Sequence, residues 1–204
     1  MRPVYSGDHE LLQRGDVQGS DPGDSSGLCG RSEPYHCVRE EMIDPTQLTR
    51  CIIRPVLKDI GYWSINAEKL VLGTCCQESD CGKYLEQLNG GPAKGIYQSE
   101  RPAMADNVDY IRRHDDLAAA VVENWMVSVY WDVDRIMEEI VWNHALATVM
   151  CRVHYLRFPE PIPDSLIGQA QMWKVCYNTE AGAGTVEEYI ASWRGFVPSD
   201  SVWV

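Results

Sequence analysis

Residues 134–157 read DRIMEEIVWNHALATVMCRVHYLR, and apolar side chains recur through the whole stretch. On a helix with 3.6 residues per turn these side chains face nearly every direction: Ile136, Ile140, Val141, Trp142, Leu146, Val149, Met150, Val153 and Leu156. An apolar surface all round a helix is typical of the buried centre of a fold. The stretch therefore predicts one long central helix over 134–157.

Helical patterns on both sides of this stretch predict a mainly α fold. Asp44, Pro45 and Gln47 have the residue types of a capped helix start, and Pro55 and Gly61 are expected to kink and to end that helix. Further helices are predicted over 66–79, 117–125 and 164–177, and after a capping box at 185–188. Residues 82–105 are rich in Gly and Pro and are expected to form loops or short β-turns.

The first 41 residues differ from the rest in composition. They are rich in Gly, Ser, Asp and Pro and carry eight acidic against four basic residues. Such a segment buries too little apolar surface to offset the entropy lost on ordering. We therefore predict an irregular N-terminal arm over 1–41, flexible or draped, and a single domain over 42–204. An exposed acidic arm is expected to dock onto neighbouring proteins.

The overall charge excludes one large class of partners. The 204-residue chain has a net charge of -12 and an isoelectric point near 4.8, whereas nucleic-acid binding requires clustered Lys and Arg. No run approaches the roughly 20 apolar residues of a membrane span. The first residues, MRPVYSGD, include no apolar core of a signal peptide. The chain is thus expected to be made in a cytoplasm, without a membrane span.

The eight cysteines are expected to be neither metal ligands nor structural disulfides of the domain. Six fall in or beside predicted helices and are interpreted as reduced, small core residues: Cys51, Cys75, Cys76, Cys81, Cys151 and Cys176. Cys29 and Cys37, in the arm, are the one pair that could form a bridge. The sequence has no Cys-x-x-Cys pair, and Cys151 and His154 lie on the predicted buried helix, so we predict no metal and no cofactor.

Glu78 is the first candidate for a catalytic residue. Val71, Thr74 and Cys75 precede it by seven, four and three residues, so Glu78 shares the apolar face of its helix. It also falls in the last turn, where the helix dipole is negative. Burial and the dipole both disfavour the carboxylate, and both should raise the pKa of Glu78. A carboxylic acid that stays protonated near neutral pH is what a general acid for glycosidic bond cleavage requires.

Three short motifs, in order, resemble those of the soluble lytic transglycosylases, a family of the lysozyme-like superfamily. QES at 77–79 resembles the Glu-Ser end of a helix in that family, GIYQ at 95–98 a Gly-Leu-Met-Gln type of loop, and YNTEAG at 177–182 a Tyr-Asn-Ala-Gly type of turn. The resemblance covers about residues 48–195. Other stretches, including RVHYLR at 152–157 and GAGTVEE at 182–188, look like a phage-encoded branch of the superfamily.

This resemblance implies a lysozyme-like domain and a reaction. Glu78 would protonate the glycosidic oxygen between N-acetylmuramic acid and N-acetylglucosamine, and would then accept a proton from the muramoyl 6-hydroxyl as a 1,6-anhydro ring closes. The resemblance also assigns substrate binding to six further residues: Ser79, Gly95, Tyr97, Gln98, Tyr177 and Asn178. Of these, Ser79 would hydrogen-bond the acid or the substrate, whereas Tyr177 could equally continue the apolar stripe of its helix.

The sequence leaves two questions open, the reaction route and the setting in which the protein acts. A water-using muramidase would need a second carboxylate roughly 5 to 9 Å from Glu78, and Asp80, Glu100 and Asp106 are near it in the chain. The favoured setting is a phage virion, in the head or the tail, whose enzyme acts on glycan strands of the host wall while its arm contacts other virion proteins. A non-catalytic virion structural protein that keeps the fold is the rival, and a soluble endolysin is a third reading.

Overall fold

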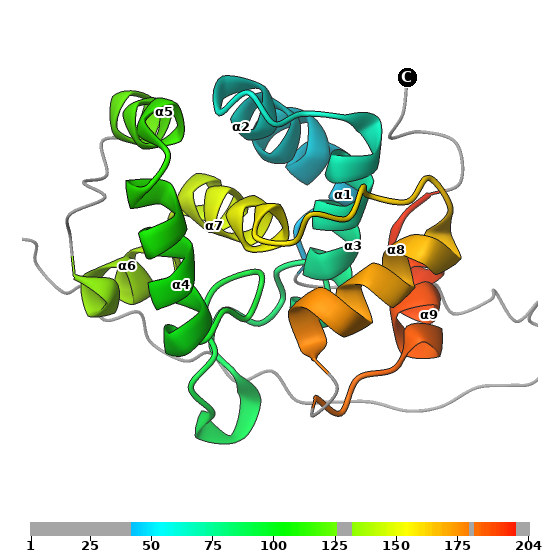
Figure 1. Ribbon diagram of the computed structural model, residues 1–204. Coiled ribbons are helices and arrows are strands. Elements are labelled where there is room, and N and C mark those ends of the chain that lie inside the picture. The colour runs from blue at the N-terminus through cyan, green and yellow to red at the C-terminus, as the bar shows by residue number, and fades with distance from the viewer. Residues whose placement is uncertain (1–41, 126–131, 180–181, 199–204) are drawn as a thin grey trace, which may run out of the picture. The chain divides into compact units, whose positions relative to one another are not determined.

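The computed structural model describes residues 42–125, 132–179 and 182–198, and these are mainly helical, as predicted (Figure 1). The α-helices are α1 (Pro45–Leu48), α2 (Arg54–Asp59), α3 (Ile65–Ser79), α4 (Arg101–Arg112), α5 (Asp115–Trp125), α6 (Val133–Glu139), α7 (His144–Leu156), α8 (Leu166–Trp173) and α9 (Val186–Phe196). Two π-helical turns, η1 (Thr49–Ile53) and η3 (Lys174–Asn178), and one 3-10 turn, η2 (Leu88–Gly90), complete the helical elements.

The described residues contain isolated β-bridges and no strand. The bridges join Lys94 to Glu86 and to Ser99, within the segment that the sequence predicts as loops and turns. The predicted arm over 1–41, with Cys29 and Cys37, lies outside the described residues. No helix among the described residues is long and apolar enough to cross a membrane.

Helix α3 is one of the two helices that are buried along most of their length. Ser64 caps its start, because the Ser64 hydroxyl oxygen accepts a hydrogen bond from the Ala67 N–H at 3.0 Å. The helix contacts η1, α7, α8 and α9, while α4 and α5 contact α7 from its other side (Figure 1). Ten residues of α3 are buried: Ala67, Glu68, Leu70, Val71, Leu72, Gly73, Thr74, Cys75, Cys76 and Ser79. Helix α3 is therefore a core helix of this fold.

The prediction of one long helix over 134–157 is wrong, because the stretch forms two helices. Helix α6 ends at Glu139 and α7 begins at His144. Between them, the Asn143 side-chain oxygen accepts a hydrogen bond from the Leu146 N–H at 3.0 Å and so caps α7. The break turns Trp142 outward, where it is 66% exposed. Helix α7 itself is buried along most of its length, as expected for a central element.

The helix predicted over 44–60 is present, and Pro55 shapes it as a widened turn. The Asp44 carboxylate accepts from the Gln47 N–H at 2.9 Å, which confirms the predicted cap. The turn before Pro55 is π-helical, and the Arg54 N–H bonds the Thr49 carbonyl. Proline has no N–H to donate to the preceding turn, and the π-turn absorbs that irregularity.

Of two further predictions about helix starts, one is wrong and one is confirmed. Residues 101–105 were predicted as loop but form the first turn of α4, because Pro102 stands in the first turn, where a missing N–H costs nothing. The capping box at 185–188 is confirmed: the Thr185 hydroxyl accepts from the Glu188 N–H, and the Glu188 carboxylate accepts from the Thr185 N–H.

An ion pair with a fully buried glutamate ties the start of α3 to α2. Glu68 has no exposed side-chain surface, and Arg54 contacts both of its oxygens, at 2.8 and 2.9 Å. The Trp63 indole N–H donates to the same carboxylate at 2.8 Å. A buried carboxylate is tolerated only when its charge is paired and its lone pairs are occupied, and here three donors meet both needs.

Five of the six domain cysteines are buried and all six are free thiols, as predicted for reduced core residues. Cys51 is the exception in position, since it is exposed on η1. Cys81 follows α3 and donates from its thiol to the Ile43 carbonyl at 3.2 Å. The described residues contain no group of three or more His, Cys, Asp and Glu side chains placed to hold a metal ion.

Gly73 marks the closest approach between α3 and α9, and it gives a direct test of the packing. A Cβ at Gly73 would overlap the Tyr189 hydroxyl. We expect Gly73→Ala to lower the free energy of unfolding by about 1–3 kcal/mol, as overpacking does in a dense core. The matched control is Gly195→Ala on α9, where an added Cβ meets nothing within 4 Å, and which should raise stability by up to about 1 kcal/mol. Thermal and urea unfolding measure both, and equal effects would contradict the packing.

Candidate active site

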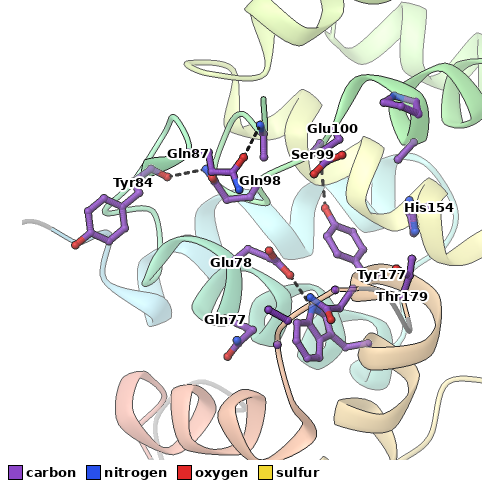
Figure 2. A pocket seen from close by; sticks show the side chains of 18 of the residues that line it. Gln77, Glu78, Tyr84, Gln87, Gln98, Ser99, Glu100, His154, Tyr177 and Thr179 are labelled. Carbon is purple, nitrogen blue, oxygen red and sulfur yellow. Dashed lines mark hydrogen bonds between the residues drawn. The ribbon is translucent and has the colours of Figure 1, made fainter. Parts of the chain in front are cut away.

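A cleft of about 730 Å³ opens at the C-terminal end of α3 (Figure 2). Its walls come from the last turn of α3, the segment from Tyr84 to Ala103, His154 of α7, and the chain from Trp173 to Gly184 as far as it is described. Five uncharged amide side chains line it: Gln77, Gln87, Gln98, Asn107 and Asn178. Three aromatic side chains do so as well: Tyr84, Trp173 and Tyr177.

Among the described residues, the charged side chains that line this cleft are acidic. Glu78 and Glu100 are its two carboxylates, and no Lys or Arg belongs to its lining among the described residues. An anionic ligand such as a phosphate is usually held by Arg, Lys or a helix N-terminus. Neutral amides beside aromatic rings instead match a neutral ligand that carries many hydroxyl and amide groups. The lining is thus suited to a carbohydrate.

Glu78 points into the cleft from the last turn of α3 and is half-buried (Figure 2). The Trp173 indole N–H donates to Glu78 Oε1 at 2.8 Å. Loss of water on burial raises the pKa of Glu78 to about 7, and the negative charge of Glu100 acts in the same direction. The hydrogen bond from Trp173 opposes this rise because it stabilises the carboxylate. The raised pKa inferred from the sequence is therefore found here, with desolvation as its main cause.

Trp173, which holds the Glu78 carboxyl group, is placed by close packing at the end of α8. Its side chain is buried, and its ring lies 5.4 Å from that of Tyr189. Gly184 passes so close that a Cβ there would come within 2.6 Å of the indole ring. The indole can therefore keep its N–H directed at Glu78 without rearranging.

The π-helical turn η3 brings Tyr177 and Asn178 to the cleft. The Tyr177 hydroxyl donates to the Tyr97 carbonyl at 2.7 Å, which joins η3 to the loop after α3. The Lys174 ammonium donates to the Asn178 side-chain oxygen and to the Gly182 carbonyl, both at 2.8 Å. These bonds fix the wall of the cleft opposite the loop. Short π-helical segments occur frequently at functional sites.

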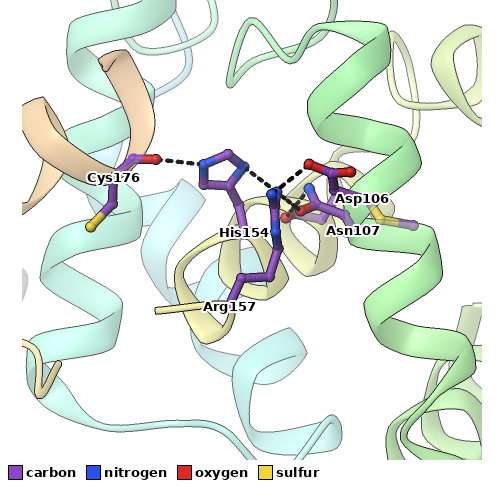
Figure 3. Close-up of polar contacts among 6 residues, drawn as sticks. Asp106, Asn107, His154, Arg157 and Cys176 are labelled. Atoms are coloured by element: carbon purple, nitrogen blue, oxygen red, sulfur yellow. Dashed lines mark hydrogen bonds and ion pairs between the residues drawn. The ribbon is translucent and has the colours of Figure 1, made fainter. Parts of the chain in front are cut away.

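His154 lines the same cleft, and Figure 3 shows its polar contacts with Cys176 and Arg157. Its Nε2 is 2.7 Å from the Cys176 carbonyl, and its Nδ1 is 3.5 Å from Arg157. A carbonyl only accepts and a guanidinium only donates, so the proton resides on Nε2. Burial lowers the pKa of His154 to about 4. Arg157 in turn pairs with Asp106 at 2.6 Å and bonds Asn107 at 3.0 Å, so the network connects α4, α7 and η3.

Backbone strain gathers around the cleft. Gln98 and Thr179 line it and have φ angles of 44° and 67°. Thr179 combines this φ with ψ 167°, a region that only glycine adopts freely. Asp80, two residues after Glu78, has φ 51°. Strained residues persist only where their surroundings hold them, and they cluster at functional sites.

Four of the seven residues that the sequence assigns to the site line the cleft: Glu78, Gln98, Tyr177 and Asn178. The Gln98 amide N–H₂ donates to the carbonyls of Gly95 at 3.0 Å and Tyr84 at 3.3 Å, which holds the loop in shape. Tyr177, for which core and site were both open, is half-buried and has a cleft-facing position.

The other three residues are not part of the cleft lining, and the structure gives them other contacts. Ser79 is 1% exposed, and its hydroxyl donates to the Ile96 carbonyl at 2.7 Å instead of to the acid. Tyr97 is buried, with its hydroxyl 3.0 Å from that of Thr148. Gly95 has φ 75°, and a Cβ there would come within 2.7 Å of the Ile140 carbonyl, so it serves a turn.

The three candidates for a second carboxylate differ in whether they line the cleft. Glu100 lines the cleft and is exposed. Asp106 pairs with Arg157, and Asp80 ends α3; neither belongs to the cleft lining. Sequence reasoning missed Trp173 and His154 as cleft residues, because a Trp in an apolar stripe and a His on a buried helix are both typical core residues.

Comparisons of the chain with models of protein families, with curated proteins and with solved structures gave no match.

The hydrogen bond from Trp173 can be tested by its effect on the pKa of Glu78. Trp173→Phe keeps an aromatic ring and removes the N–H, so we expect the pKa of Glu78 to rise further above about 7. Carbon-13 NMR titration of the glutamate carboxyl groups measures it, with Glu78→Gln to assign the resonance. Trp142→Phe, at an exposed tryptophan outside the cleft, is the control and should leave the value unchanged. An unchanged or lowered pKa in Trp173→Phe would contradict the assignment.

Proposed function

We propose that this protein cleaves the β-1,4 glycosidic bond between N-acetylmuramic acid and N-acetylglucosamine in peptidoglycan, with Glu78 as the general acid. The observation that carries the proposal is a carboxyl group with a pKa of about 7 directed into a cleft. Near neutral pH such a group is protonated in a large fraction of molecules and can still give up its proton. The proposed lysozyme-like relationship rests on the sequence motifs around this residue.

The cleft lining supports a glycan as the substrate. The five amide side chains offer both donors and acceptors to sugar hydroxyl and acetamido groups. The aromatic residues offer apolar faces of the kind that pack on sugar rings. The absence of Lys and Arg from the described lining argues against phosphate esters as substrates.

The proposed reaction uses Glu78 twice. The Glu78 carboxylic acid gives its proton to the glycosidic oxygen, the bond from that oxygen to muramoyl C1 breaks, and the N-acetylglucosamine end leaves as an alcohol. The Glu78 carboxylate then takes the proton of the muramoyl 6-hydroxyl while that oxygen bonds to C1. The products are a 1,6-anhydro-muramoyl end and a protonated Glu78, so no water is consumed.

Trp173 and Glu100 have opposite effects on the protonation of Glu78, which acts first as an acid and then as a base. The indole N–H stabilises the carboxylate that forms when the proton leaves, and the charge of Glu100 favours its return. Glu100 is also the one of the three candidate acids that faces the same cleft. A hydrolytic route would assign it to activating water, and the product distinguishes the two routes.

The reaction is tested by digestion of purified peptidoglycan with the full chain. We expect anhydro-muropeptides by mass spectrometry, and a loss of activity of at least about 100-fold in Glu78→Gln, as for removal of a general acid. Glu100→Gln is the matched variant, an exposed carboxylate in the same cleft, and should retain the anhydro products. Reducing-end products that require Glu100 would replace the one-carboxylate route with hydrolysis. Undiminished activity in Glu78→Gln would refute the assignment of Glu78 as the general acid.

The pH dependence gives a separate test. Only the protonated form of Glu78 can act, so kcat/KM should fall as pH rises through about 7, approaching tenfold per pH unit above it. Glu100→Gln removes a charge that raises the pKa of Glu78, so the fall should begin at lower pH. Rates between pH 5 and 9 at constant ionic strength measure both. If kcat/KM of Glu100→Gln falls at the same pH as that of the wild type, the charge of Glu100 does not raise the pKa of Glu78.

The setting that we propose is a phage particle that carries the enzyme to the wall. Cell wall is anionic, and a chain with net charge -12 gains no electrostatic attraction to it, so delivery by a particle fits this charge better than free diffusion. The same charge also fits a non-catalytic structural protein of the virion. Zymography with wild type and Glu78→Gln separates enzyme from scaffold, and mass spectrometry of purified particles separates a virion protein from a free endolysin.

A further inference from the structure

A second pocket, of about 330 Å³, lies at the other end of α3. Ser64 and Asn66 border it from the start of that helix, and Arg152 and Tyr155 border it from α7. Because α3 has 15 residues at 1.5 Å each, about 20 Å separates this pocket from Glu78. Its volume falls in the range of small-ligand sites. No step of the proposed cleavage uses it.

Arg152 is the unusual feature of this pocket. Its side chain is half-buried, and burial lowers its pKa. Its Nε donates to the Tyr62 carbonyl at 3.3 Å, and its guanidinium carbon lies 5.9 Å from the centre of the Tyr62 ring. Among the described residues it has no carboxylate partner, and its two terminal nitrogens have no hydrogen-bond acceptor.

The other partly buried arginines are satisfied differently. Arg54 and Arg157 each meet a carboxylate oxygen within 2.8 Å. The terminal nitrogens of Arg152 remain accessible to solvent, and the planar fork of a guanidinium fits a carboxylate with two parallel hydrogen bonds. The position of Arg152 beside a pocket therefore corresponds to one half of an ion pair whose other half is a ligand.

The other residues that line the pocket restrict the chemical class of the ligand. The pocket is bordered by the N-terminal end of α3, where the helix dipole favours an anion, and by the Asn66 amide, which reaches the Ile162 carbonyl only at 3.4 Å. Glu160, an exposed acid, lines the same pocket. A purely anionic ligand such as phosphate would be repelled by Glu160, whereas a ligand with a carboxylate and an N–H-bearing cation or amide complements both charges. Phe158, with its ring half-buried, adds an apolar wall.

We infer that this pocket binds the carboxylate end of a short peptide, with Arg152 on the terminal carboxylate and Glu160 on a nitrogen of the same ligand. Two sources share this chemistry: the stem peptides of the cell wall, which end in D-amino acids, and the C-terminus of an ordinary protein partner. The stem-peptide source rests on the proposed function, whereas binding of a peptide carboxylate in this pocket uses none of the cleft residues.

The experiment is calorimetric titration of the full chain with small peptides. D-alanyl-D-alanine and L-alanyl-L-alanine stand for the two sources, their C-terminal amides lack the carboxylate, and inorganic phosphate tests a simple anion. We expect one of the two dipeptides to bind at least about tenfold more tightly than its amide, as loss of a charge-assisted pair implies. Preference for the D-form assigns the stem peptide, and preference for the L-form assigns a protein terminus.

Variants separate binding from a structural role of Arg152. Arg152→Lys keeps the positive charge and loses the planar fork, and it should weaken the dipeptide about tenfold with little change in unfolding temperature. Arg152→Met should abolish the difference between acid and amide. Glu78→Gln is the control and should bind as wild type does. Equal binding of acid and amide by wild type, or tighter binding of phosphate than of either dipeptide, would overturn the inference.

Discussion

Helix α3 is enclosed on nearly every side, so each of its polar side chains needs a partner inside the protein. Glu68 finds Arg54, the Thr74 hydroxyl lies 2.8 Å from that of Tyr155 on α7, and the Ser79 hydroxyl reaches the loop after the helix. Each such bond joins α3 to a different neighbour. The need to satisfy a buried helix therefore determines how the surrounding elements are placed, and it leads directly to the site.

Glu78 is the polar residue of α3 whose environment is only partly compensated. Among the described residues, the hydrogen-bond donor to Glu78 is the Trp173 indole, whereas Glu68 has three donors. The difference is chemical: the fully paired Glu68 serves the fold, and the singly bonded Glu78 is left with a carboxyl group that can hold or release a proton. The two glutamates of this helix therefore differ in how many hydrogen-bond donors contact each carboxylate.

The sequence predicts much of this arrangement where local rules decide it. Glu78 could be placed because helical phase and helix end both follow from nearby residues, and the caps at Asp44 and Thr185 follow from short-range hydrogen bonds. The helix break at Asn143 could not be predicted from the sequence, because an Asn cap competes with a continuous apolar pattern. Only tertiary packing decides between the two. Likewise, neighbouring motif residues such as Gln98 and Tyr97 face opposite sides of a strained turn, and residue type alone does not reveal which one meets the cleft.

The π-helical turn η3 has a consequence for how related chains should be aligned. Such a turn corresponds to an α-helix with one residue inserted, and each residue of an α-helix turns the chain by about 100°. A relative that lacks this insertion would place the residue aligned with Tyr177 on another face. Chain length at this point, as well as residue identity, therefore decides whether a relative retains the wall of the cleft. An alignment that forbids a gap between Lys174 and Asn178 would pair residues that occupy different positions in space.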